Sequence, residues 1–190
     1  MLKKIIITGL GLSALIVALP LIGNTTLKTS IDKRLKAVEA AGISIKKNDS
    51  KSNYFNTNIH YDFTVSDKDK LHKYLSDLSQ QQIPPYLSAV LDGSTISSDI
   101  SYFNIPLVSN IDIDIYPAEL SKDSYKDLAK NDEVLAKQLS KLIKNKALLY
   151  HISYGVGTQE FSGYLKNINE TIKMKNGTNI NFVIADASFS

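Results

Sequence analysis

The chain contains no cysteine among its 190 residues. It therefore has no disulfides, no thiolate zinc site and no cysteine nucleophile. Arginine is nearly absent as well, because Arg34 is the only arginine among 22 basic residues. Arginine and aromatic residues are not interleaved, so the chain lacks the pattern typical of nucleic-acid binding. We expect its stability to depend on packing alone, and we expect no nucleic-acid partner.

Charge is absent from one long segment, Ile5–Ile22, which follows two lysines. A helix of this length spans about 27 Å, close to the ~30 Å hydrocarbon core of a bilayer. We predict that residues 1–23 form an uncleaved signal anchor, a transmembrane helix with its lysines in the cytoplasm. The lysine-rich segment 28–36 opposes that orientation. The alternative is a cleaved signal peptide and a mature chain that starts near Asn24.

The remaining residues, 24–190, are numerous enough for one domain with a hydrophobic core. Gly42 suits the left-handed position that ends a helix. A helix before it would face the core, lie on a membrane surface or pair with a second copy of the chain. Apolar residues recur at helical spacing in three segments: Thr25–Ala41, the stretch after Ser66, and Ser121–Lys146 with a break near Asn131.

Strand-like alternation is clearest in Phe55–Val65, where every second residue is apolar. A strand is also predicted to begin at Ile43, followed by a polar loop at 46–52. Asn176-Gly177 predicts a hairpin turn. Further alternating segments are Ser94–Ile105, Leu107–Tyr116, Leu148–Tyr154, Glu160–Lys175 and Thr178–Phe189.

The predicted fold class is α+β: an N-terminal transmembrane helix followed by a curved antiparallel β-sheet with two or three α-helices against one face. The sequence ends within an alternating pattern at Ser190. This indicates either an exposed last strand or a truncated member of a longer family.

Candidate metal ligands are few. Asp112 and Asp114 share one face of a predicted strand and could begin a calcium site, but no further acidic cluster joins them, so a solvent-exposed face is favoured. His60, His72 and His151 lie in separate elements without ligand spacing. His60 and His151 fall in strands, where a solvent-exposed face or a cross-strand partner explains them. We predict no metal site.

Catalytic motifs are also missing. Ser-x-x-Lys occurs at Ser30–Lys33 and Ser44–Lys47, but the companion motifs of serine acyl enzymes are absent. Gly155–Gly157 lacks the third glycine and the following helix of a nucleotide loop, and we expect it to mark a turn or bulge. We therefore predict no catalytic residues, no cofactor-binding residues and no cofactor, and we expect that the protein is not an enzyme.

Three short motifs accompany this order of elements: NYFNT at Asn53–Thr57, IPL at Ile105–Leu107 and FSG at Phe161–Gly163. With the basic start, the membrane helix and the amphipathic helix, they resemble the family of bacterial inner-membrane proteins typified by YdgA, whose function is unknown. That family has Gly where Asn53 stands, and a His and a Gly in its second motif that are absent here. The resemblance covers most of this chain but only the N-terminal part of a typical member. It implies a single-pass envelope protein with a periplasmic β-rich domain, and it carries over no catalytic residues.

These features lead to three functional hypotheses. The first is a non-enzymatic envelope protein whose domain binds an apolar ligand, a lipid held in the concavity of the sheet, or a protein partner. The second is a structural module that forms homo-oligomers through the helix Thr25–Ala41 or through an exposed last strand. The third is an adhesin or virulence factor, periplasmic or secreted after signal cleavage. The first two place the chain in the bacterial inner membrane.

Overall fold

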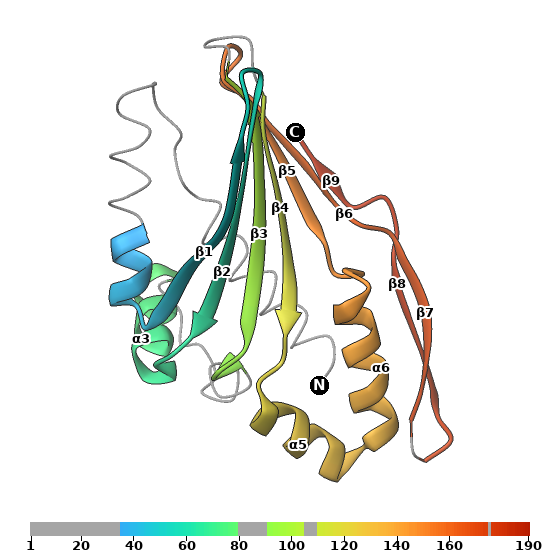
Figure 1. Ribbon diagram of the computed structural model, residues 1–190. Coiled ribbons are helices and arrows are strands. Elements are labelled where there is room, and N and C mark those ends of the chain that lie inside the picture. Colours follow the sequence, from blue (N-terminus) through green and yellow to red (C-terminus); the bar gives the residue numbers. More distant parts are fainter. Residues whose placement is uncertain (1–34, 80–90, 105–109, 175) are drawn as a thin grey trace.

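The computed structural model describes residues 35–79, 91–104, 110–174 and 176–190. They form an α+β domain built on a large antiparallel sheet (Figure 1), as the sequence predicts. The predicted membrane helix Ile5–Ile22 lies outside these residues, and of the predicted helix Thr25–Ala41 only a helical segment at 35–40 falls within them. Within the described ranges, no helix is both long enough and apolar enough to cross a membrane.

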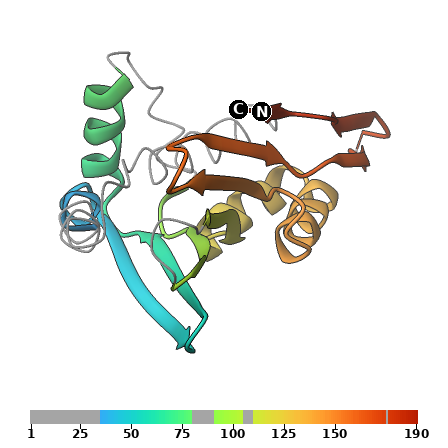
Figure 2. The same cartoon turned by 90° about the horizontal axis from the view of Figure 1, so that it is seen from above.

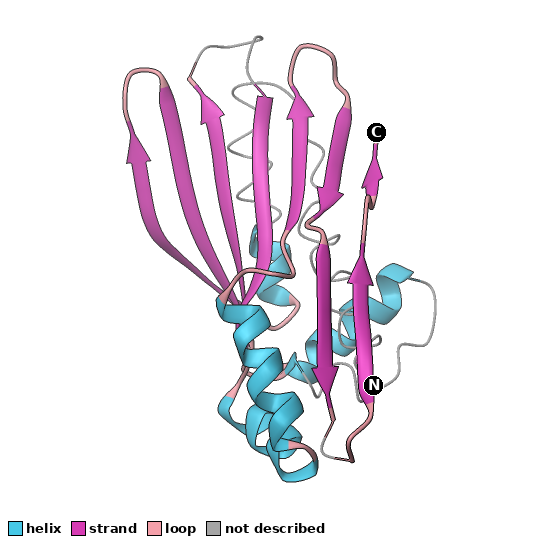
Figure 3. Ribbon diagram, turned by 90° about the vertical axis from the view of Figure 1, so that its right-hand side faces the viewer, coloured by secondary structure: helices cyan, strands magenta, loops and turns pink. Residues whose placement is uncertain are grey.

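Seven strands form the main sheet, and each neighbouring pair is antiparallel. The first six are neighbours in sequence order, and the last returns beside the sixth. Their bounds are β1 Ile43–Ser52, β2 Asn56–Val65, β3 Thr95–Phe103, β4 Asn110–Glu119, β5 Tyr150–Gly155, β6 Phe161–Leu165 and β9 Ser188–Phe189. A separate two-stranded hairpin, β7 (Ile168–Lys173) and β8 (Asn179–Ile184), lies beside the sheet (Figure 3).

One face of the sheet is apolar because alternate residues of its strands are aliphatic or aromatic. The helix α3 (Lys68–Ser79) covers this face with Leu71 and Leu75, both buried. Burying a leucine side chain contributes about 1.5–3 kcal/mol, so this layer holds the helix against the sheet. The strand residues in this core are Ile43, Phe63, Val65, Ile96, Ile115 and Ile152.

Gly42 joins the helical segment 35–40 to β1 in the predicted left-handed conformation, with φ of 83°. Its carbonyl accepts hydrogen bonds from the backbone of Ser66 and Asp67 at 2.8 and 3.0 Å. A Cβ at this position would lie 2.5 Å from the carbonyl oxygen of Asp67, so only glycine fits. Asp67 caps the start of α3 by accepting from the amides of Asp69 and Lys70, whereas the Ser66 hydroxyl donates to the carbonyl of Gly42.

The predicted helical break near Asn131 is confirmed. Helix α5 (Lys122–Asn131) ends there, and Asp132 caps α6 (Glu133–Lys144) by accepting from the amide of Leu135 at 3.0 Å. The apolar stripe of α6 packs on the β7–β8 hairpin to form a second core. Its buried members are Leu135, Leu139, Leu142, Ile143, Ile168, Ile172 and Phe182.

The helices do not share one face of the sheet as predicted. Viewed from above, α3 lies on one side of the sheet and α5 and α6 lie on the other (Figure 2). This arises because α6 has its own apolar partner, the β7–β8 hairpin, and does not pack into the core that α3 forms with the sheet.

Two strand predictions are also corrected. The polar segment 46–52, predicted as a loop, continues β1 to Ser52, because its backbone pairs with β2 past a bulge between Lys47 and Asp49. The predicted strand Glu160–Lys175 is divided into β6 and β7, and Thr178–Phe189 into β8 and β9. The predicted hairpin at Asn176-Gly177 joins β7 to β8, with a φ of 82° at Gly177.

Candidate functional site

A row of polar side chains crosses five strands on the sheet face opposite the α3 core. In the strand register, His60 of β2 is opposite Asp99 of β3, which is opposite Asp114 of β4. Asp114 is opposite His151 of β5, and His151 is opposite Tyr164 of β6. We call His60, Asp99, Asp114 and His151 the His–Asp row. Like charges directly opposite destabilise a sheet, so Asp99 and Asp114 need other partners.

His60 lies between two carboxylates. Its Nδ1 is 2.5 Å from Asp99 Oδ1, and its Nε2 is 3.1 Å from Asp62 Oδ1. The hydrogen bond to Asp99 raises the pKa of His60 above its usual 6.5, and burial only partly opposes this. A protonated imidazole donates from both nitrogens, so this geometry favours the charged form. His60 therefore binds a proton more readily between Asp99 and Asp62 than a free imidazole does.

Asp99 accepts hydrogen bonds from the two neighbouring strands β2 and β4 and from the turn after α6. Burial alone would raise its pKa, but hydrogen bonds from His60 and Tyr116 and the charge of Lys146 outweigh burial, so the pKa lies below the usual 3.8. Tyr116 donates to Asp99 Oδ2 at 2.8 Å, and Lys146 Nζ lies 3.3 Å from the same oxygen. Lys146 Nζ is also 3.8 Å from the ring centroid of Tyr116, a cation–π contact.

Lys146 reaches this face from the turn after α6. Its backbone is in the left-handed region, with φ of 48°, and its amide donates to Ile143 O at 2.9 Å. That conformation costs a non-glycine residue on the order of 1 kcal/mol or more, and it aims the ammonium at the sheet. The α6 turn is thereby attached to β3 and β4.

His151 pairs with Asp114 at the other end of the row. Its Nδ1 is 2.7 Å from Asp114 Oδ1, and its Nε2 is 3.8 Å from Asp112 Oδ1. The imidazole also stacks on Tyr164, with ring centroids 4.8 Å apart. The expectation that a cross-strand partner explains His60 and His151 is therefore confirmed for both. Asp112 and Asp114, considered above as calcium ligands, face a histidine instead.

The row borders an open recess of about 390 Å³ whose lining includes His60, Asp99, Asp112 and Asp114. Ser97 Oγ donates to Asp62 Oδ1 at 2.5 Å, so the serine in this network contacts a carboxylate and not a histidine base. Within the described ranges, no three or more His, Asp or Glu residues are arranged to hold a metal ion. The recess is an open, charged surface on which His60 is bonded to Asp99, and the Asp114 that lines it is bonded to His151.

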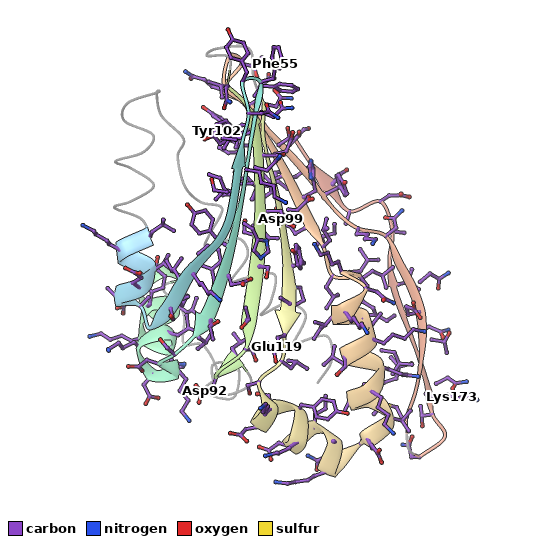
Figure 4. The ribbon with its side chains drawn as sticks, viewed as in Figure 1. Phe55, Asp92, Asp99, Tyr102, Glu119 and Lys173 are labelled. Carbon is purple, nitrogen blue, oxygen red and sulfur yellow. The ribbon has the colours of Figure 1, made fainter. Side chains whose placement is uncertain are left out.

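An exposed aromatic surface lies at the end of the sheet away from the helices. Figure 4 shows Phe55 and Tyr102 at this end, where β1 turns into β2. Four large aromatic side chains are exposed there: Tyr54 at 87%, Phe55 at 59%, Phe103 at 55% and Phe161 at 39%. We call these four residues the aromatic tip. The rings of Tyr54 and Phe55 contact each other, with centroids 5.1 Å apart, and exposed apolar side chains at one end of a sheet are candidates for an interaction site.

A hydrogen-bonded turn between β1 and β2 holds the tip. Asn53 Oδ1 accepts from the amides of Phe55 and Asn56 at 2.9 and 2.7 Å. Asn104 connects this turn to the end of β3, because its amide donates to Phe55 O and its side-chain Nδ2 to Asn53 O, both at 2.7 Å. Thr57 Oγ1 also donates to Asn104 Oδ1 at 2.7 Å. These bonds hold the turn backbone while Tyr54 and Phe55 point into solvent.

The remaining sequence candidates are scattered. His72 lies in α3, Ser44–Lys47 lies in the edge strand β1, and Gly155–Gly157 covers the end of β5 and the start of the β5–β6 turn. Ser30–Lys33 lies outside the described residues. Sequence reasoning missed Asp99 and Lys146. The alternation Ser97, Asp99, Ser101 was the available signal for the first, and nothing in the local sequence marks the second.

No family model, curated protein or solved structure matches the chain significantly. The resemblance to the YdgA family therefore stays a prediction. Of its three motifs, Asn53–Thr57 forms the β1–β2 turn and the start of β2, and Phe161–Gly163 begins β6. Ile105–Leu107 lies outside the described residues. Two of the motifs thus fall at or beside the aromatic tip.

Proposed function

We propose that this chain is a non-catalytic protein of the bacterial inner membrane, tethered by Ile5–Ile22, whose domain contacts a lipid surface through the aromatic tip. The observation that carries the proposal is the exposure of Tyr54, Phe55, Phe103 and Phe161 at one end of the sheet. Tyrosine and phenylalanine suit a lipid interface, where an aromatic ring leaves water without needing a shaped pocket.

The aromatic tip can contribute a substantial free energy of transfer to a lipid surface. Burying a phenylalanine side chain completely is worth about 1.5–3 kcal/mol. Half of that for each of Phe55 and Phe103 amounts to about 2 kcal/mol, or roughly 30-fold in partitioning. The charges near the tip, Lys51 and Glu160, are of opposite sign. The tip is therefore close to neutral, which lowers the cost of bringing it to a lipid surface.

The segment between the proposed anchor and the domain is long enough for the tip to reach the bilayer. Between the apolar segment and the described domain lie the twelve residues 23–34, which can extend at most about 40 Å. A ten-residue strand such as β1 measures about 33 Å. The domain can therefore bring its tip back to the bilayer that holds the anchor. Lys3 and Lys4 favour a cytoplasmic N-terminus and hence a domain outside the cytoplasm.

The role of the polar face in this proposal is structural. Each ionisable group of the His–Asp row has a charged or hydrogen-bonding partner within the sheet. Such a face stays hydrated and does not compete with the tip for lipid. The lipid is therefore assigned to the tip and not to the concavity of the sheet, where Leu71 and Leu75 of α3 already pack.

The absence of tryptophan from the chain allows a direct test. Full-length Phe55→Trp is reconstituted into phosphatidylethanolamine–phosphatidylglycerol vesicles. We expect a blue-shifted emission and quenching by brominated acyl chains. The control is Tyr125→Trp on α5, at the helical end of the sheet, which we expect to be unquenched. Water-like, unquenched emission from Phe55→Trp would refute lipid contact and would favour a protein partner for the tip.

A further inference from the structure

The strand β8 is an open edge of the β7–β8 hairpin. Within the described residues it pairs with β7 alone (Figure 3). An unpaired strand edge presents backbone N–H and C=O groups that can bind another strand. The amide of Met174 donates to Thr178 O at 2.8 Å at the hairpin end. Because hydrogen-bonded pairs alternate in an antiparallel ladder, Ile180, Phe182 and Ile184 bond to β7.

The backbone groups of Asn179, Asn181 and Val183 consequently point away from β7. These outward positions carry no charge, and the whole segment 176–185 contains no charged residue and no proline. Two of its apolar side chains are also exposed, Ile180 at 37% and Val183 at 58%. Nothing in this segment discourages pairing with a further strand.

The two edges of the main sheet, β1 and β9, are protected. Strand β1 carries exposed Lys46 and Lys51 and has a bulge between Lys47 and Asp49. Lysines and bulges are the usual means by which proteins prevent edge-to-edge association. Strand β9 has only two residues. Among the described strands, β8 thus combines an open edge with a sequence that favours pairing.

We propose that β8 is an interface on which a second copy of this chain pairs, β8 against β8 in antiparallel orientation. A two-fold axis at Phe182 places Ile180 of one copy opposite Ile184 of the other, and Asn181 opposite Val183. Opposite residues of an antiparallel pair project to the same face. The partly exposed Ile180 is therefore covered, and the two hairpins join into one four-stranded sheet whose apolar face carries both α6 helices.

The second copy is favoured as the occupant because β8 is self-complementary in this register. No charge on one copy meets a like charge on the other, and the apolar residues Ile180, Phe182 and Ile184 meet one another. A strand of an unrelated partner would not need β8 to match itself in this way.

The absence of cysteine makes cross-linking specific. Asn181→Cys is introduced into the full-length chain in detergent micelles. Across a β8–β8 pair, positions 181 are diagonal neighbours about 7–8 Å apart, within reach of a short thiol cross-linker. The matched control is Thr171→Cys, at the exposed position opposite Asn181 on β7. Positions 171 would be separated by three strand spacings, about 14 Å, which is too far for the same reagent.

We expect covalent dimer from Asn181→Cys and little from Thr171→Cys. Adding Val183→Lys to Asn181→Cys places a charge on the outward edge and should abolish most of that dimer, whereas adding Thr171→Lys should not. Both lysines replace exposed side chains, and circular dichroism verifies that each variant folds. Equal cross-linking at positions 181 and 171, no cross-linking at 181, or dimer that survives Val183→Lys would each overturn the proposal.

Discussion

Replacing Asp99 with asparagine should reveal how much the His–Asp row stabilises the domain. Asp99→Asn keeps the shape and one acceptor oxygen but removes the charge that faces His60 and Lys146. Hydrogen bonds to charged groups contribute about 1.5–3 kcal/mol. The Asp99 side chain is 42% exposed, so solvent screening reduces this figure. We expect a loss of about 1–2 kcal/mol, or about 3–6 °C in melting temperature for a domain of this size.

This loss should depend on pH in a defined window. The pKa of His60 is raised above 6.5 in the folded protein. Its contribution is therefore complete below pH 6.5 and is lost as the pH rises through the folded value. The pKa of Asp99 is lowered below 3.8, so its contribution is complete above pH 3.8 and is lost as the pH falls. The two contributions coincide between pH 3.8 and 6.5.

The assay is thermal unfolding of the full-length protein in detergent, followed by circular dichroism from about pH 3 to 9. The control is Asp127→Asn, which removes the same charge from an exposed i,i+3 pair with Lys130 on α5. We expect the difference between wild type and Asp99→Asn to peak inside the window, and the control to show no such peak. A difference that is flat in pH, or equal to that of Asp127→Asn, would refute the coupling between protonation of His60 and the charge of Asp99.

Two further predictions concern local structure. Gly42→Ala should destabilise the domain by about 2 kcal/mol or more, because φ of 83° disfavours a side chain and the new Cβ would meet the Asp67 carbonyl. Urea unfolding measures this loss of stability. A change below about 0.5 kcal/mol would contradict the prediction. Asp132→Ala removes the cap of α6 and should lower the free energy of unfolding by about 1 kcal/mol, whereas Asp132→Asn should keep most of that stability. Equal losses in the two variants would show that the cap bond to Leu135 is unimportant.

Several elements were predictable because their periodicity is local. The alternation of Phe55–Val65 corresponds to β2, and the interrupted helix Ser121–Lys146 corresponds to α5 and α6 with a break beside Asn131. The same reasoning failed for the polar segment 46–52. An edge strand is held by backbone pairing with β2, and backbone hydrogen bonds leave no trace in side-chain hydrophobicity.

The candidate site was only partly predictable for a related reason. Alternation indicated that His60 and Asp114 occupy strands, but not which residue lies opposite each one. His60 and Asp99 are 39 positions apart, and Asp114 and His151 are 37 apart. Lys146 comes to the same network from a turn after α6. Its role depends on a left-handed backbone at a non-glycine residue, which the local sequence does not indicate.

The sequence alone determined the α+β class, the apolar segment Ile5–Ile22 and the faces of the strands, because composition and period are properties of neighbouring residues. Tertiary structure alone decided the strand register, and with it the His–Asp row, the gathering of Tyr54, Phe55, Phe103 and Phe161 at one end, and the open edge at β8. The physical reason is that register depends on pairing between distant segments, and a shift of one residue would turn every side chain to the other face.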